Sequence, residues 1–128
     1  ANNPGAKPFE DGMLSGLVQK FWTVHGVQNT DDADFLPGLD RSVVAFTVRK
    51  GMDKRVDSYS AFYDNGKAAS AELKAQYPFL GTSTGLAEWM VQKAVEAGAT
   101  HIEVDVIGLA TDYCVKFTAL DAAAETFQ

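Results

Sequence analysis

The one cysteine of the sequence lies in the segment GLATDYCVKF, residues 108–117. The preceding residues, 101–108, predict a strand, and those from about Asp112 onward predict a helix, so Cys114 falls in the first turn of that helix. A thiol there meets the positive end of the helix dipole and unpaired backbone N–H groups, and both favour the thiolate. The same N–H groups can receive the oxyanion of a tetrahedral intermediate. The segment therefore predicts a nucleophile for acyl transfer, although a free cysteine is more often a small buried apolar side chain.

A lysine follows a second apolar segment. Lys50 comes near the end of SVVAFTVRKG, residues 42–51, which predicts a strand covered on both faces. Ligands of parallel sheets bind beyond the carboxyl ends of the strands. If the two predicted strands are neighbours, Lys50 and Cys114 face one crevice, and the ammonium favours the thiolate. Taken alone, Lys50 is more often a solvated surface lysine.

The remaining elements must position these two groups. Residues 1–16 are rich in Gly, Pro and Asn and predict a loop, and residues 52–70 predict a long polar connection with a turn at DNG. Residues 83–98 give the best helix signal, with Ser83 or Thr84 as its cap and Gly98 at its C-terminal end. Strands alternating with helices predict an α/β fold, a parallel sheet flanked by helices, in a single domain over residues 1–128.

Composition restricts the partners. Eleven basic and 17 acidic side chains give a formal charge of −6, which argues against nucleic acid or an anionic membrane as the main partner. No apolar run approaches the roughly 20 residues that span a bilayer. One cysteine makes no internal disulfide, which favours a reducing, cytoplasmic location.

Three separated segments resemble one family. GLATDYCVKFTALDA resembles the nucleophile segment of nicotinamidases, which are isochorismatase-like cysteine hydrolases, VRKGMDKRVDSYSAFYDNG resembles their lysine loop, and FWTVHGVQNTDDADFLPGL resembles their W-P-x-H-C-V-Q segment. The resemblance implies an isochorismatase-like, Rossmann-like three-layer fold. It also implies hydrolysis of nicotinamide to nicotinate and ammonia through a cysteine thioester, with pyrazinamide as an analogue substrate and a place in NAD salvage.

The resemblance also implies roles for single residues. Cys114 is the implied nucleophile, Lys50 belongs to the catalytic triad, and the N–H groups of Ala110 and Cys114 form the oxyanion hole. The family carries a cis peptide bond at the position of Leu109–Ala110, so a cis bond is expected here.

Other matched positions would hold the substrate and a metal. Trp22 and Tyr59 match rings that flank the pyridine, and Tyr113 and Leu109 are expected to border the same pocket. His25 matches one ligand of a divalent metal ion, which is zinc, iron or manganese. Taken alone, Trp22 and Tyr59 are more often packing residues, and His25 is more often structural.

The sequence also departs from the family pattern. The V-D-x-Q-x-D-F segment with the triad aspartate, the other metal ligands and the C-terminal strands are absent, so the chain is expected to lack the N-terminal and C-terminal parts of the domain. Such a sheet exposes an unpaired edge, which predicts a homo-oligomer or poor folding. Two alternatives stay open: another amidohydrolase of the superfamily, such as one acting on carbamoyl groups, and a catalytically inactive fragment that acts as a binding or oligomerisation module.

Overall fold

The structure is a computed structural model that describes residues 5–125. The chain divides into two compact units, residues 1–47 and residues 48–128. The prediction of one domain over residues 1–128 stays a prediction.

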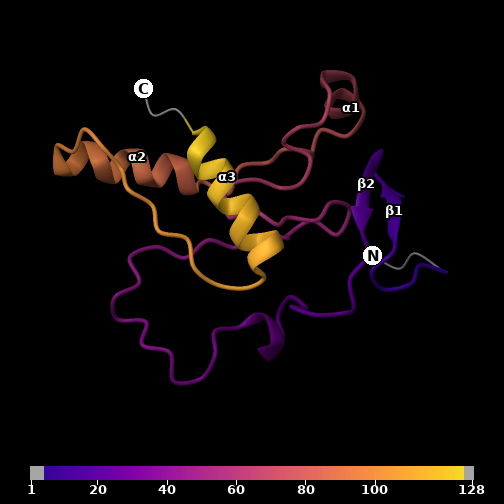
Figure 1. The fold of residues 1–128 in the computed structure, drawn as a ribbon, viewed down its shortest axis with the longest axis horizontal. Helices are drawn as coiled ribbons and strands as arrows, with labels where there is room; N and C mark the ends of the chain where they lie inside the picture. Colours follow the sequence, from indigo (N-terminus) through magenta and orange to yellow (C-terminus); the bar gives the residue numbers. More distant parts are fainter. Residues whose placement is uncertain (1–4, 126–128) are drawn as a thin grey trace. The chain divides into compact units, whose positions relative to one another are not determined.

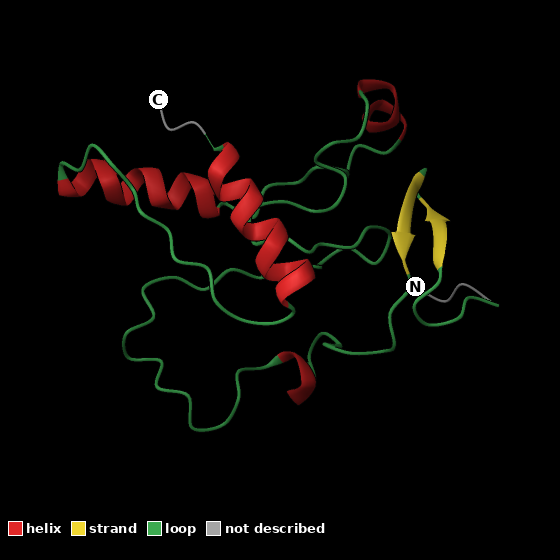
Figure 2. Ribbon diagram, in the orientation of Figure 1, coloured by secondary structure: helices red, strands yellow, loops and turns green. Residues whose placement is uncertain are grey.

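The first unit contains a β-hairpin (Figures 1 and 2). Strand β1 (Asp11–Leu14) pairs antiparallel with strand β2 (Leu17–Lys20). The connecting Ser15 and Gly16 have φ values of 52° and 74°, and two residues with positive φ make the turn that matches the twist of paired strands. The loop prediction is therefore wrong from Asp11 onward, because the Ser-Gly turn closes a hairpin. Further along lies the short 3-10 helix η1 (Asp31–Ala33).

The second unit contains the longer helices. Helix α1 spans Ala71–Gln76, and helix α2 spans Leu86–Ala97, which confirms the predicted helix. Gly98 ends α2 in the left-handed conformation at φ 61°, as predicted. The predicted cap is wrong, because Gly85 occupies the N-cap position. The hydroxyl of Thr84 nevertheless accepts a hydrogen bond from the N–H of Leu86 at 3.3 Å.

The C-terminal helical segment is also present. A π-helical turn, η2 (Thr111–Val115), leads directly into helix α3 (Lys116–Ala124), which confirms the helix predicted from about Asp112. An extended stretch joins α2 to η2, drawn in orange in Figure 1.

Leu80 and Ala87 help to form the core of the second unit, and its other buried apolar side chains come from the connection between Lys50 and α1. Its side chains are buried alternately at Val56, Ser58, Ser60 and Phe62, and Phe62 is only 1% exposed. The Ser60 hydroxyl accepts a hydrogen bond from the N–H of Phe62 at 3.0 Å, which satisfies a buried donor. The connection forms the turn expected at DNG, since the N–H of Lys67 donates to the carbonyl of Asp64.

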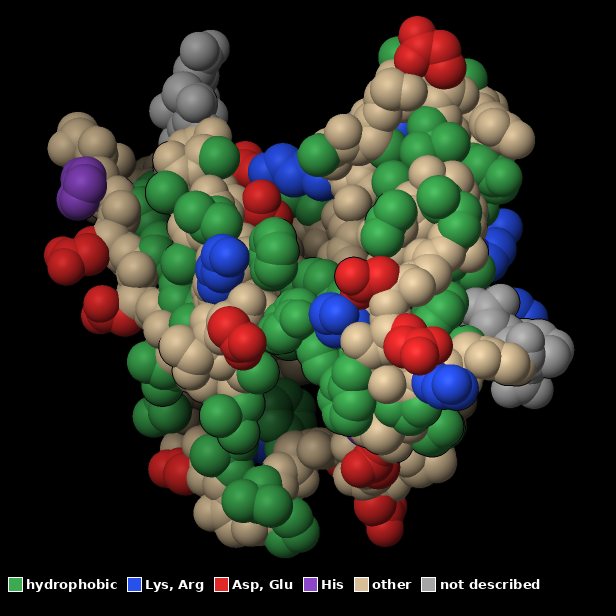
Figure 3. Space-filling view, turned by 45° about the vertical axis from the view of Figure 1, so that its right-hand side comes forward, with side chains coloured by type: hydrophobic (Ala, Val, Ile, Leu, Met, Phe, Trp, Pro, Cys, Tyr) green, Lys and Arg blue, Asp and Glu red, His purple; other side chains and the backbone are tan. Residues whose placement is uncertain are grey.

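The two predicted parallel strands are not formed. Residues 42–51 and 101–108 have no regular secondary structure, and the one sheet among residues 5–125 is the β1–β2 hairpin. A strand is stable only when its backbone N–H and C=O groups find a partner strand, and none of the described segments pairs with these residues. Most of their apolar side chains are therefore exposed, 83% for Val43 and 92% for Ile107. Figure 3 shows hydrophobic side chains spread widely over the face that it draws. None of the helices in residues 5–125 combines the length and the apolar character needed to cross a bilayer.

Candidate active site

Cys114 lies in the fourth position of η2 and is half-buried. The carbonyl of Ala110 accepts hydrogen bonds from the N–H groups of Tyr113 and Val115, both at 3.2 Å, and these bonds close the turn around the cysteine. The peptide bond between Leu109 and Ala110 is cis, as predicted. The thiol therefore sits on a defined turn at the start of a helical segment, partly open to solvent.

The side chain of Lys50 reaches this thiol. Its Nζ lies 3.4 Å from Sγ of Cys114 and also donates to the carbonyl of Ser58 at 2.8 Å. Among the described residues, the ammonium forms no ion pair with a carboxylate. The proximity expected from the sequence is present, although the strands that were expected to produce it are not. The chain itself achieves it through residues 51–58, which curve so that the Ser58 carbonyl holds the ammonium.

An aromatic cluster adjoins the cysteine. The ring of Tyr59 lies edge-on to that of Tyr113, with centroids 5.2 Å apart, and its centroid is 5.4 Å from that of Phe117. Tyr113 and Phe117 flank Cys114 in the sequence, so Tyr59 packs against the segment that carries the thiol. Leu109 is 89% exposed and takes no part in this cluster. The structure thus places Tyr59 and Tyr113 together beside Cys114.

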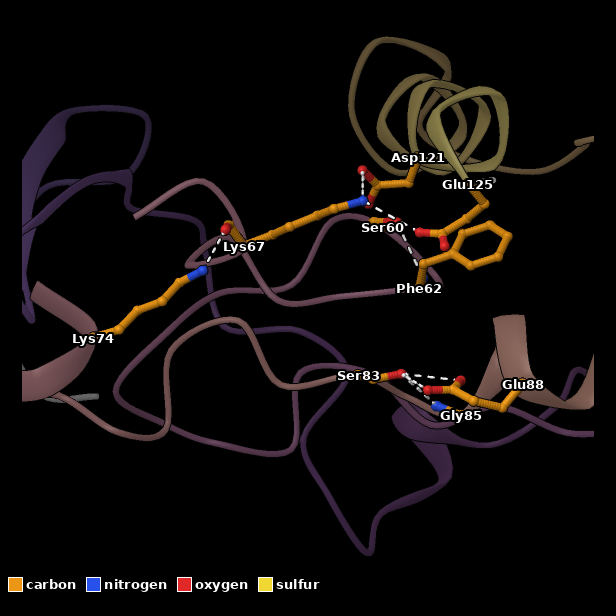
Figure 4. A network of polar contacts seen from close by, with 9 residues as sticks. All are labelled: Ser60, Phe62, Lys67, Lys74, Ser83, Gly85, Glu88, Asp121 and Glu125. Atoms are coloured by element: carbon orange, nitrogen blue, oxygen red, sulfur yellow. Dashed lines mark hydrogen bonds and ion pairs between the residues drawn. The ribbon is translucent and has the colours of Figure 1, made fainter. Parts of the chain in front are cut away.

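A charged network fastens α3 to the connection that carries Tyr59 (Figure 4). Lys67 Nζ lies 3.1 Å from a carboxylate oxygen of Asp121 and 3.4 Å from one of Glu125. Burial lowers the pKa of Lys67, but the hydrogen bonds and charges of Asp121 and Glu125 outweigh burial, so the pKa lies above its ordinary value. The ammonium also lies 4.1 Å from the centroid of the Tyr63 ring. Burial first, and then Glu125, raise the pKa of Tyr63.

Trp22 and His25 belong to the first unit and are placed only within it. The ring of Trp22 packs edge-on against Phe9, with centroids 6.0 Å apart. His25 is exposed, and its Nδ1 lies 2.6 Å from the carbonyl oxygen of Thr23.

The described residues do not by themselves fit a metal site. Protein-bound zinc takes three or four side-chain ligands. No group of three or more His, Cys, Asp or Glu side chains suited to a metal ion occurs within residues 5–125. Nδ1 of His25 already contacts the backbone oxygen of Thr23. Residues 5–125 place no other metal-binding side chains together with His25 to complete a site.

An open hollow of about 440 Å³ lies on the Lys50 side of the second unit. Lys50 and Ser58 line it, and Cys114 does not. Its other lining residues are Arg49, Gly51, Met52, Asp53, Val56, Asp64, Phe79, Thr82, Ser83 and Thr84. The hollow therefore borders Lys50, which in turn contacts Cys114, and it does not border the cysteine itself.

The chain resembles known proteins along nearly its whole length. It is 40% identical to a nicotinamidase of Escherichia coli over 122 residues, which is 95% of this chain and 48% of that protein. It is 34% identical to a nicotinamidase of Acinetobacter baylyi over 96% of this chain and 49% of that protein. The chain is therefore similar to nicotinamidases. No family model matches it.

A solved structure gives the same result for the fold. The chain matches a nicotinamidase and pyrazinamidase of Acinetobacter baumanii with a TM-score of 0.69 and 36% identity, over 96% of this chain and 50% of that one. Its fold class is therefore that of this enzyme, the predicted isochorismatase-like α/β fold, although the sheet found within residues 5–125 has only two strands. The chain spans about half the length of the curated relatives that it matches.

Sequence reasoning missed some groups around the site. The carbonyl of Ser58 holds the Lys50 ammonium, the Phe117 ring completes the aromatic cluster, and the Thr118 hydroxyl contacts the same connection. Phe117 and Thr118 follow Cys114 by three and four positions, which places them on its side of a helix. That spacing is the one sequence signal that could have identified them. A backbone carbonyl such as that of Ser58 leaves no sequence signal.

Proposed function

We propose that the protein hydrolyses nicotinamide to nicotinate and ammonia, with Cys114 as nucleophile and Lys50 as the cation that stabilises its thiolate. The observation that carries the proposal is the 3.4 Å contact between Lys50 Nζ and Cys114 Sγ at the start of a helical segment. A thiolate is the reactive form of cysteine, and a neighbouring ammonium favours it. The similarity to nicotinamidases supports the choice of substrate.

In the first half of the reaction the thiolate attacks the carboxamide carbon. A C–S bond forms and the carbonyl oxygen becomes an oxyanion, which we assign to the backbone N–H groups of Ala110 and Cys114. The oxyanion then re-forms the carbonyl, the C–N bond breaks, and the nitrogen takes up a proton and leaves as ammonia. The acyl group remains as a thioester on Cys114.

In the second half of the reaction water attacks the thioester carbon. One proton of the water returns to the Lys50 amine and the other passes to solvent, the C–S bond breaks, nicotinate leaves, and the sulfur returns to the thiolate beside the restored ammonium. The cation acts at both stages because the sulfur is anionic before acylation and again after hydrolysis. The proton that reaches the departing nitrogen needs a donor, and we assign that role to the Lys50 ammonium, which lies 3.4 Å from the sulfur.

For the ring of the substrate we propose an aromatic wall. Tyr59 and Tyr113 lie together beside Cys114, so a flat pyridine ring can pack against them. We propose Trp22 as a second wall and Leu109 as a border of the same pocket, on the family resemblance alone. Pyrazinamide has the same flat shape and the same carboxamide, and we expect it to be a second substrate, as the name of the Acinetobacter baumanii enzyme indicates for that protein.

We infer a divalent metal requirement only from the family resemblance. His25 would contribute one ligand, and the described residues supply no others, so no step above depends on a metal. Adding zinc, iron or manganese to protein treated with a chelator tests the requirement. We further infer a cytoplasmic enzyme, because the single thiol has to stay reduced to act.

Ammonia release from nicotinamide tests the proposed activity. We expect turnover by the parent protein, with and without added zinc, iron or manganese compared side by side, and none by Cys114→Ala. Lys93→Ala is the matched control, because Lys93 lies on the exposed side of α2 and, within the part of the chain that the structure describes, pairs with Glu96 and with no site residue. Folded parent protein that releases no ammonia under any of these metals would overturn the proposal and favour the inactive binding or oligomerisation module.

A further inference from the structure

The backbone of Ala61 is held from two sides by threonine hydroxyls. Its N–H donates to Oγ1 of Thr118 at 3.0 Å, and its carbonyl accepts from Oγ1 of Thr84 at 2.6 Å. Thr118 belongs to α3, and Thr84 lies just before α2. One residue of the core connection therefore links both helices, and all three residues are half-buried.

The bond from Thr118 is the one that bears on the thiol. Thr118 follows Cys114 by four residues and so lies one helical turn beyond it on the same side. Ala61 lies just after Ser58, whose carbonyl binds Lys50, and after Tyr59, whose ring contacts that of Tyr113. The hydrogen bond between Thr118 and Ala61 thus holds the helical segment that carries Cys114 against residues 58–61, the stretch that also binds Lys50.

We propose that Thr118 is a positioning residue that sets the contact between Cys114 and Lys50. Rotation or sliding of α3 along the connection would move Sγ away from Nζ, and the hydroxyl of Thr118 opposes that movement by anchoring the helix to a backbone N–H. The aromatic contacts of Tyr59 are apolar and permit sliding, whereas a hydrogen bond has a narrow range of distance and angle. The inference rests on the proposed role of Cys114.

The rate at which iodoacetamide alkylates Cys114 tests the inference. The rate is measured from pH 6 to pH 9 by the mass of the peptide that carries Cys114. Thr118→Val keeps the shape of the side chain and removes the acceptor. We expect it to react about tenfold more slowly than the parent near neutral pH. This is the change in an equilibrium constant that corresponds to the net free energy of one hydrogen bond. The difference should close at high pH, where the thiol is ionised in both proteins, because access to the sulfur is unchanged.

Two further variants separate positioning from general stability. Thr118→Ser keeps the hydroxyl and should react within about twofold of the parent. Thr84→Val removes the other hydroxyl that holds Ala61, from a segment that carries no site residue, and should slow alkylation less than Thr118→Val. If Thr118→Val does not fold, Thr118→Ser still decides the matter, since parent-like alkylation supports the proposal and slowed alkylation overturns it.

The results that would overturn the inference are definite. They are Thr118→Val reacting at the rate of the parent, Thr84→Val reacting as slowly as Thr118→Val, or a difference that persists at high pH. Alkylation needs no turnover, so this outcome is separate from that of the proposed function. A parent that shows the alkylation pattern and releases no ammonia would refute the hydrolysis and leave the positioning role supported.

Discussion

Removing the Lys50 ammonium should make Cys114 a poorer nucleophile. A unit charge 3.4 Å from the sulfur interacts with a thiolate by about 1.2 kcal/mol in bulk water and about 5 kcal/mol at an effective dielectric constant of about 20. Lys50 is exposed and Cys114 is half-buried, so the true value lies toward the lower limit. About 1.2 kcal/mol corresponds to roughly an eightfold change in the thiolate fraction at neutral pH.

The assay is the rate of iodoacetamide reaction at pH 7. Lys50→Met keeps most of the apolar length of the side chain and removes the charge, and we expect it to react about five to ten times more slowly than the parent. Lys50→Arg keeps a cation and should recover part of the rate. Lys93→Met, which removes an ammonium from the surface of α2, is the matched control and should leave the rate unchanged.

The reasoning is refuted if Lys50→Met reacts as fast as the parent while circular dichroism shows the same helix content. The 3.4 Å contact would then have no electrostatic consequence, and Lys50 would serve only to bind the Ser58 carbonyl.

Three further predictions concern stability, measured by urea or thermal unfolding. Phe62→Ala should cost about 3–5 kcal/mol, because Phe62 is fully buried, and a loss below about 1 kcal/mol would show that it is not the centre of the core. The hydrogen bond from Arg55 lowers the pKa of Asp53 from its ordinary value of 3.8 to about 2. Asp53→Asn should therefore lower the free energy of unfolding by about 0.5 kcal/mol above pH 4, and this difference should vanish as the pH falls toward 2. A difference that has already vanished at pH 4 would contradict this. Gly66→Ala would put a Cβ 2.6 Å from that of Leu80 and should cost about 1–3 kcal/mol, and parent-like stability would contradict that contact.

The sequence predicted the elements whose signals are local. Helix α2 has apolar residues at helical spacing and a glycine at its end, and both features can be recognised without knowledge of the rest of the fold. The segment beginning at Asp112 likewise forms a helix, with Cys114 in its opening turn. The hairpin was missed because its strands are short and lie among Gly and Pro residues, although Ser15-Gly16 is a turn signal.

The elements that depend on distant partners were not predictable. Residues 42–51 and 101–108 have the composition of buried strands, but composition does not supply the neighbouring strand that the backbone needs. Lys50 and Cys114 meet all the same, because the connection from Lys50 to Phe62 folds on itself and contacts the start of α3. Nothing in the sequence indicated that this polar connection supplies Val56 and Phe62 to the core of the second unit.

The central claim is that amide hydrolysis passes through a thioester on Cys114, and partitioning with hydroxylamine tests it most directly. Hydroxylamine intercepts a thioester and converts it to the hydroxamate, in competition with water. We predict that nicotinamide turnover in the presence of hydroxylamine yields nicotinohydroxamate in proportion to its concentration, while ammonia release continues and Cys114→Ala yields neither product. Ammonia release with nicotinate as the sole acyl product at every hydroxylamine concentration, or equal turnover by Cys114→Ala, would contradict the account.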